Sequence, residues 1–188
     1  MRVFLKLVLF FPLISGQQLS TPKIEYAPKS YVCYKVSEPI VVDGKINDVS
    51  WQKANWSESF VDIEGDLKPN PFFDTKVKML WDENYFYFVA QMEEPHVWAT
   101  LKDRDAIIYK DNDFEIFLDP DGDTHHYYEL EVNALETEWD LLLLKPYRDQ
   151  AKVAVDSWDI PGLITKVYVD GTINNPSDKD RGWIVEIA

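Results

Sequence analysis

The stretch DNDFEIFLDPDGDTHHYYELEVN, residues 111–133, contains two runs in which apolar and polar side chains alternate. Successive side chains of a β-strand point to opposite faces, so this period of two predicts strands at 114–118 and 127–133. In each strand one face is apolar and suits a core, whereas the other face carries acids. The Pro-Gly-containing segment between the strands is typical of a turn.

The same period of two recurs along most of the chain. Residues 75–81 and 85–92 flank an Asp-Glu-Asn turn, so they are predicted to form a β-hairpin. Further strands are predicted at 138–144, 165–169 and 182–188. Many short strands without a long amphipathic helix predict an all-β fold, an antiparallel β-sandwich of jelly-roll type.

The stretch EPIVVDGKINDVSWQKA, residues 38–54, predicts a different element. A short strand at 40–42 is expected to run through an Asp-Gly turn into one or two helical turns. Asn47 or Asp48 can cap these helical turns, and Trp51 is expected to face inward. The sequence therefore predicts a short helical lid anchored on the sheet by this tryptophan.

The chain of 188 residues, 46% of them apolar, is long enough for one sizeable core. Residues 1–17 are predicted to be a signal peptide, because two basic residues precede an apolar run that is too short to cross a bilayer. Residues 18–35 are predicted to be a leader segment and residues 36–188 the β-sandwich domain. The mature protein is expected to be secreted or periplasmic, without a transmembrane segment.

Composition and chain ends add three expectations. With 33 acidic and 19 basic residues the formal charge is −14, so nucleic acid and anionic membranes are poor partners. The single cysteine, Cys33, cannot form an internal disulfide bond. The last predicted strand reaches Ala188 without a closing turn, so the domain is expected to be incomplete at this end.

The acidic faces of the two strands in the opening stretch require an explanation. If the strands pair, Asp113 and Glu115 lie near Glu129 and Glu131, and like charges facing one another across a sheet are destabilising by up to about 1 kcal/mol per pair. Three kinds of group can offset this repulsion: a divalent cation, a ligand rich in hydroxyl groups, or the basic side chains Arg104, Lys110 and Arg148. The alternative is a solvated sheet face covered by long basic side chains.

Aromatic residues in the same region favour a carbohydrate ligand. Tyr109, Tyr127, Trp98 and Trp139 accompany the acids. Aromatic rings stack on the C–H faces of sugars, and carboxylate and amide oxygens accept hydrogen bonds from sugar hydroxyls. The predicted carbohydrate-binding residues are Tyr109, Glu115, Glu131 and Asn133.

The loop DPDGD, residues 119–123, is a candidate calcium site. Asp119, Asp121 and Asp123 are spaced two apart, so that their oxygens can converge on one ion. The glycine and proline positions do not match an EF-hand loop, and an acidic turn without metal is the alternative. Structural calcium is therefore a predicted cofactor.

Four stretches, in this order, resemble the carbohydrate-binding module family 9 and its relatives: EPIVVDGKINDVSWQKA, VKMLWDENYFYFVAQMEEP, DNDFEIFLDPDGD followed by YYELEVNA, and RGWIVEIA. The resemblance covers about residues 38–188. It implies a non-catalytic β-sandwich that binds polysaccharides, oligosaccharides or simple sugars, often carries calcium and accompanies secreted glycoside hydrolases in carbohydrate catabolism. It also implies a stacking role at Tyr109, where the family has tryptophan, and a hydroxyl acceptor at Glu115. Glu131 replaces the family's arginine, a reversal of charge.

Two other functions are consistent with parts of the sequence. Glu115 with Glu129 or Glu131 could be the acid and nucleophile of a glycoside hydrolase acting on O-glycosyl bonds. Related sandwich domains bind haem, for which the candidate ligands are His96, His125, His126, Met79 and Met92.

Overall fold

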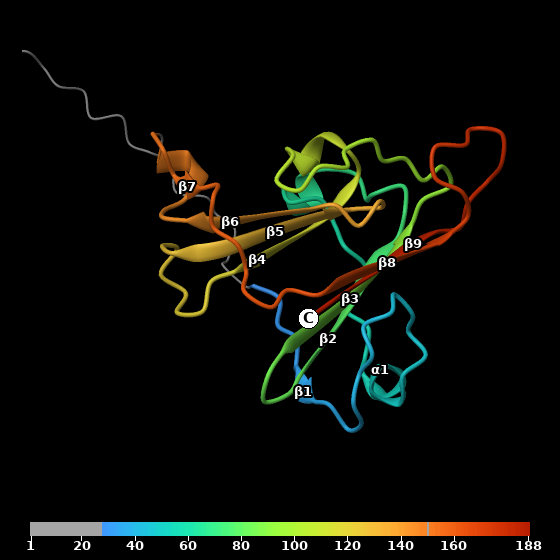
Figure 1. The fold of residues 1–188 in the computed structure, drawn as a ribbon, viewed down its shortest axis with the longest axis horizontal. Coiled ribbons are helices and arrows are strands. Elements are labelled where there is room, and N and C mark those ends of the chain that lie inside the picture. Colours follow the sequence, from blue (N-terminus) through green and yellow to red (C-terminus); the bar gives the residue numbers. More distant parts are fainter. Residues whose placement is uncertain (1–27, 150) are drawn as a thin grey trace, which may run out of the picture. The chain divides into compact units, whose positions relative to one another are not determined.

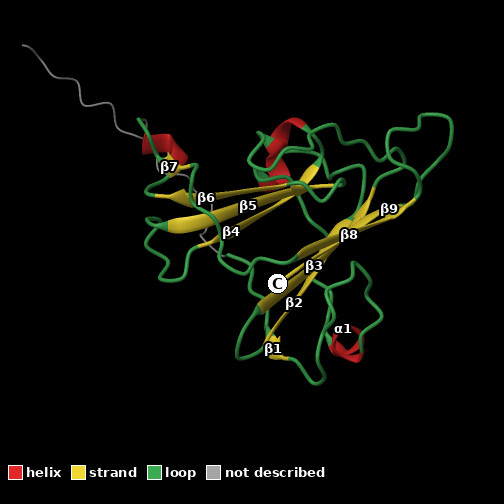
Figure 2. Ribbon diagram, in the orientation of Figure 1, coloured by secondary structure: helices red, strands yellow, loops and turns green. Residues whose placement is uncertain are grey.

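The predicted strands from residue 75 onward are present, and the strands lie in two sheets (Figures 1 and 2). The five-stranded sheet has the order β1 (Tyr34–Lys35), β2 (Thr75–Trp81), β3 (Phe86–Glu93), β9 (Gly182–Ile187) and β8 (Thr165–Asp170). The four-stranded sheet has the order β4 (Asp113–Leu118), β5 (Tyr127–Asn133), β6 (Glu138–Leu143) and β7 (Ala154–Val155). All neighbouring strands are antiparallel except β1 and β2, which are parallel.

The structure is a computed structural model that describes residues 28–149 and 151–188. Tyr31–Ala188 form one compact unit. The predicted signal peptide and most of the predicted leader lie outside the described residues. Among the helices that are described, none has the length and apolar character needed to cross a bilayer. They are α1 (Val49–Lys53) and the 3₁₀ helices η1 (Gly65–Leu67), η2 (Ile108–Lys110) and η3 (Tyr147–Asp149).

The main core lies between the two sheets. Alternate residues of β4 and β5 point into it, as the period of two predicts, and Phe114, Ile116, Leu130 and Val132 are all buried there. They pack against apolar side chains of the other sheet, among them Val185 at the centre of β9. The all-β sandwich predicted from the alternation is confirmed.

The predicted helical lid is also present. Helix α1 covers the other face of the five-stranded sheet, where Trp51 is 0% exposed and belongs to a second core cluster with Leu80, Tyr87 and Val89. The indole Nε1 of Trp51 donates a hydrogen bond of 2.7 Å to Glu186 Oε1 on β9. Trp51 therefore anchors the lid through both its ring and its polar edge.

The turn that leads into the lid is held by the same glutamate. Glu186 Oε2 accepts the backbone N–H groups of Asp43, at 2.8 Å, and Gly44, at 3.0 Å. Gly44 has φ of +80°, and a Cβ atom there would lie 3.1 Å from the backbone nitrogen of Tyr168. Glycine is favoured at this position because it tolerates positive φ and because the turn packs against β8.

Three details near the N-terminus differ from the prediction. Residues 40–42 form no strand, because the edge of β2 is paired with β1, which lies inside the predicted leader. Ile40 and Val42 nevertheless pack on the second core cluster. Asp48 is at the N-cap position of α1, but its side chain makes no capping hydrogen bond, so the predicted cap is wrong.

Candidate functional site

The outward face of the four-stranded sheet carries Asp113, Glu115, Glu129 and Glu131, which we call the acidic strip. In the register of β4 and β5, Glu115 lies directly opposite Glu131, and Phe117 lies opposite Glu129. Asp113 precedes Glu115 on the same face of β4. The prediction that these acids face one another across two paired strands is confirmed.

Two members of the acidic strip are buried, which the sequence pattern does not indicate. Glu131 is 1% and Glu129 is 3% exposed. The backbone N–H of Tyr109, in η2, donates a hydrogen bond of 2.8 Å to Glu131 Oε2. The hydroxyl of Tyr147, in η3, donates a hydrogen bond to Glu129 Oε2. Two short 3₁₀ helices thus contribute hydrogen-bond donors to this face of the sheet.

Burial and mutual repulsion shift the acidity of these groups. Burial and the nearby Asp113 raise the pKa of Glu131 to about 8. Burial and the charge of Glu115 raise the pKa of Asp113 to about 7. Burial also raises the pKa values of Glu115 and Glu129. At neutral pH the acidic strip therefore retains protons, so its carboxyl groups can donate as well as accept hydrogen bonds.

No basic side chain forms an ion pair with the acidic strip within the described part of the chain. Arg104, a predicted neutralising group, instead pairs with Glu138, Asp140 and Asp159. Asp140 is the register partner of the core residue Leu130, so it lies on the opposite face of the sheet. The predicted role of Arg104 is therefore wrong, because its acidic partners alternate with the residues of the outward face. Among the other ion pairs of the described residues, Arg148 pairs with Asp149 and none includes Lys110.

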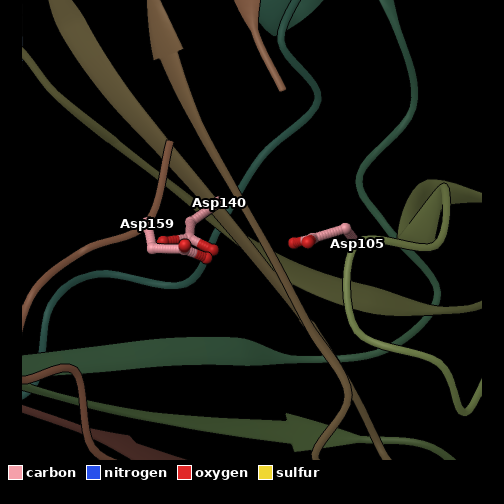
Figure 3. A group of neighbouring side chains, drawn as sticks. All are labelled: Asp105, Asp140 and Asp159. Carbon is pink, nitrogen blue, oxygen red and sulfur yellow. The ribbon is translucent and has the colours of Figure 1, made fainter. Parts of the chain in front are cut away.

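Figure 3 shows a second acidic group, formed by Asp105, Asp140 and Asp159, in which Asp105 points towards the other two. One oxygen from each residue lies within 4.8 Å of the others. Asp140 Oδ1 accepts a 2.6 Å hydrogen bond from Arg104, and Asp159 Oδ1 accepts one of 3.1 Å from the same guanidinium. The arginine supplies positive charge to this group of acids. The group connects β6 to two loops, so its role is structural.

Exposed aromatic rings accompany the acidic strip. The rings of Tyr109 and Trp139 have centroids 6.0 Å apart, and those of Phe117 and Tyr127 have centroids 6.3 Å apart. Trp139 is the register partner of Glu131. Tyr109 is 57% and Phe117 is 48% exposed, so both offer ring surface to a ligand. Each pair places a partly open aromatic surface next to carboxyl groups.

The other predicted site residues have different surroundings. Asn133 is fully buried, and its amide donates to Leu101 O and Asp111 Oδ2 and accepts from the backbone N–H groups of Leu135 and Thr137. These four bonds use the whole hydrogen-bonding capacity of the amide, so Asn133 is a structural residue with no free group for a ligand. Trp98 is exposed but makes no ring contact with either aromatic pair in the described part of the chain.

A cavity of about 570 Å³ lies beside the first residues of β4. Asp113 lines it, together with Asn112, His96 and two aromatic residues that the sequence analysis did not single out, Phe72 and Phe73. The ring of Phe72 is almost entirely exposed. The available signal was two consecutive phenylalanines in a proline-bounded loop, PNPFFD. One end of the acidic strip is therefore adjacent to a concave surface.

The predicted calcium residues lie together in the loop after β4. Asp119, Asp121 and Asp123 each place one oxygen within 4.8 Å of the other two. Asp119 also accepts the backbone N–H groups of Gly122, at 3.1 Å, and Thr124, at 2.9 Å. Carboxylate oxygens are the ligands that calcium prefers, so the donor set fits this ion, while the turn itself also uses these carboxylates.

The candidate haem ligands do not share one environment. His125 and His126 are exposed in this same loop, and His96 is exposed in the loop after β3. Met92 is buried in the main core between the sheets.

A family model described as "Carbohydrate family 9 binding domain-like" matches residues 42–172. Endo-1,4-beta-xylanase A of Thermotoga maritima is 32% identical over 89 residues, which are 47% of this chain and 8% of that protein. Endo-1,4-beta-xylanase C of Paenibacillus barcinonensis is 32% identical over 88 residues, 47% of this chain and 7% of that protein. Exoglucanase XynX of Acetivibrio thermocellus is 26% identical over 100 residues, 53% of this chain and 8% of that protein. The matches thus span less than a tenth of the length of each relative.

Among solved structures, the fold is similar to that of a carbohydrate binding module family 9 from Caldicellulosiruptor kristjanssonii in complex with cellotriose. The TM-score is 0.53 at 20% identity, covering 82% of this chain and 65% of that one. A structure of a family 9 module from the same organism with glucose gives a TM-score of 0.53 at 21% identity and the same coverage. At this identity the similarity establishes the β-sandwich fold.

Proposed function

Since the chain belongs to the carbohydrate family 9 binding domain-like family, we propose that its β-sandwich binds carbohydrate and is not itself catalytic. The observation that carries the proposal is the outward face of the four-stranded sheet, where exposed Tyr109 and Phe117 lie beside carboxyl groups. Aromatic rings and carboxyl oxygens together meet the two requirements of a sugar, an apolar C–H face and a rim of hydroxyl groups.

The named relatives support a role for this binding in polysaccharide breakdown. Two of them are xylanases and one is an exoglucanase, so we propose that this protein takes part in polysaccharide breakdown alongside enzymes that hydrolyse glycosidic bonds. The ligand would be an oligosaccharide or polysaccharide, and the structural relatives are complexes with cellotriose and glucose. The predicted signal peptide supports export of the protein to the compartment where such polymers are found.

Within the proposed site, the residues have separate tasks. Tyr109 offers its ring as a stacking surface, supported from the side by Trp139. Glu115 is exposed and accepts hydroxyl hydrogen bonds. Glu131 is buried and protonated over part of the neutral range, and it orients Tyr109 by accepting its backbone N–H.

Replacing Tyr109 by alanine is expected to lower the affinity for a bound oligosaccharide about tenfold, because an aromatic contact of this kind contributes about 1–1.5 kcal/mol. The melting temperature should change little, since the side chain is 57% exposed. Glu115→Gln is expected to weaken binding severalfold, because charge-assisted hydrogen bonds are about twice as strong as neutral ones. It should leave stability unchanged or slightly higher, because repulsion with Glu131 is relieved.

The measurement is calorimetric titration with glucose, cello-oligosaccharides and xylo-oligosaccharides, with thermal melts in parallel. Tyr34→Ala, an exposed tyrosine on β1, is the matched control and should bind like the native protein. If Glu115→Gln loses stability but keeps its affinity, the glutamate is structural and the proposed site is wrong. Release of reducing sugar by the purified domain would instead favour the glycosidase alternative.

We also propose that Asp119, Asp121 and Asp123 hold a structural calcium ion, supported by the convergence of their oxygens. A ligand that binds only the folded state, present at a hundred times its dissociation constant, stabilises by about 2.7 kcal/mol. The melting temperature should therefore fall in chelator and recover when calcium is added. Asp121→Asn should abolish this response, whereas Asp156→Asn, at an exposed acid outside this group, should retain it. Identical melting curves with calcium and with chelator would exclude the site.

A further inference from the structure

Resting on the proposed function, we propose that the acidic strip and its two aromatic pairs select a carbohydrate that carries a protonated amine, such as a glucosamine oligomer, over an uncharged sugar. Three features of this face suit an amino sugar: several neighbouring carboxyl groups, one carboxyl oxygen without a hydrogen-bond donor, and exposed aromatic rings beside the acids.

Four carboxyl groups lie on one small surface of the four-stranded sheet. Asp113, Glu115 and Glu131 each bring an oxygen within 4.8 Å of the other two, and Glu129 lies two residues before Glu131 on the same face of β5. No basic residue of the described chain forms an ion pair with any of them. The second acidic group differs in this respect, because Arg104 lies within it. Bound protons neutralise part of this charge at neutral pH, and a cationic ligand would neutralise the rest.

One oxygen of the strip lacks a hydrogen-bond donor. Asp113 Oδ2 is shielded from solvent and has no hydrogen-bond partner among the described residues. A buried acceptor without a donor destabilises the folded protein, and a bound donor would remove this cost. Asp113 is also one of the residues that line the cavity of about 570 Å³. A primary ammonium has three N–H donors, which suits a site formed by several carboxyl oxygens.

The aromatic rings distinguish an amino sugar from a bare metal ion. Tyr109 and Trp139 lie beside Glu131. Phe117 is the register partner of Glu129, and the ring of Tyr127 lies next to that of Phe117. A metal ion would use the oxygens alone. A sugar with an ammonium group would use the oxygens for its charge and the exposed rings for its C–H face, and the ring faces themselves attract cations.

Binding of a cation should also change the protonation of the site. The titratable and charged groups around this face are the four acids of the strip, the tyrosines Tyr109, Tyr127 and Tyr147, and the nearby Asp111, Asp119, Arg148 and Asp149. Burial raises the pKa of Glu131 and of Asp113, so both are partly protonated at neutral pH. A bound ammonium would favour their ionised forms and should release protons to the buffer.

The experiment is calorimetric titration of the native domain with three tetrasaccharides: the β-1,4 tetramer of glucosamine, the corresponding N-acetylglucosamine tetramer and cellotetraose. The glucosamine tetramer is expected to bind at least about tenfold more tightly than the other two, with proton release detected by comparing buffers of different ionisation enthalpy. The difference should shrink as salt is raised.

Variants separate the acidic strip from the protein's overall negative charge. Glu131→Gln keeps an acceptor for the N–H of Tyr109, and Glu115→Gln changes an exposed position. Each should reduce the preference for the amine. Glu83→Gln, at an exposed acid outside the strip, is the control and should not reduce it. Tyr109→Ala should weaken all three sugars alike. An unchanged preference in both strip variants would mean general charge attraction and would overturn the inference.

The remaining outcomes separate this inference from the proposed function. Equal affinity for cellotetraose and the glucosamine tetramer would overturn the inference and leave carbohydrate binding in place. Binding of none of the tetramers would overturn both. Titration with calcium chloride alone gives the last outcome. If calcium binds the native domain, this binding is lost in Glu131→Gln, and the domain shows no preference for the amine, the strip is a metal site and the amino sugar is rejected.

Discussion

Replacing Trp51 by alanine is expected to lower the free energy of unfolding by about 3–5 kcal/mol, the range for removal of a buried large aromatic side chain. The ring is 0% exposed and packs with Leu80, Tyr87 and Val89, so alanine would leave a cavity under the lid. The substitution also removes the donor to Glu186 Oε1, a carboxyl group that is itself buried on β9. Equilibrium unfolding in denaturant measures the change.

Two further variants make this prediction specific. Trp51→Phe keeps most of the ring volume but lacks the N–H, so it should lose an intermediate amount of stability. Trp98→Ala, at a tryptophan that is 48% exposed, should stay within about 0.5 kcal/mol of the native protein. If Trp51→Ala is as stable as Trp98→Ala, the lid does not contribute to the core as described.

The stability of the domain is expected to decrease by several kcal/mol between about pH 4.5 and about pH 8. Glu131 and Asp113 have pKa values of about 8 and about 7 in the folded protein, against 4.5 and 3.8 for the free side chains. Below pH 4 both states hold these protons, so stability is unaffected. As the pH rises towards 8 the unfolded chain ionises first and binds fewer protons than the folded chain, so unfolding is favoured.

Denaturant unfolding across this pH range tests the prediction. Glu131→Gln should flatten the dependence and be more stable than the native protein at pH 8, whereas Glu83→Gln should follow the native profile. Hydrogen bonds hold the pKa values of Asp82 and Asp180 below their ordinary range, so their contribution is lost only in stronger acid. The native protein should therefore be most stable near pH 4 to 5. A steady rise in its stability up to pH 8 would show that ionisation of the strip's carboxyl groups does not destabilise the folded protein.

The long strands could be predicted from the sequence because each has a clear period of two. Strands β2 and β5 have the predicted bounds, β3 is shifted by one residue at both ends, and β4, β6, β8 and β9 differ by one residue at one end. Strands β1 and β7 have two residues each, which is too short for any period. The sequence therefore does not distinguish β1 from the leader, and it predicts a strand at 40–42, where Ile40 and Val42 only pack their side chains on the second core cluster.

The candidate site could be predicted in part. Alternation places Glu115 and Glu131 on one face, and this follows from local sequence. The burial of Glu131 and Glu129 does not, since these carboxyl groups accept hydrogen bonds from Tyr109 and Tyr147, which lie in the short helices η2 and η3 outside the periodic strands. The contacts of Arg104 and Asn133 were missed for the same reason. Each binds groups that are distant along the chain, and no periodic pattern records such contacts.

The strand order of the five-stranded sheet also bears on how the chain folds. Strand β9 lies between β3 and β8, so its partner β3 is about ninety residues earlier in the chain. The sheet cannot be completed, and Glu186 cannot reach the lid, until residues 182–187 have been synthesised. At roughly 5–20 residues per second, the earlier hairpin would wait for several seconds with its apolar face open. Such non-local pairing is slow, on the order of milliseconds to seconds, so during synthesis the nascent chain is expected to need protection by chaperones from aggregation.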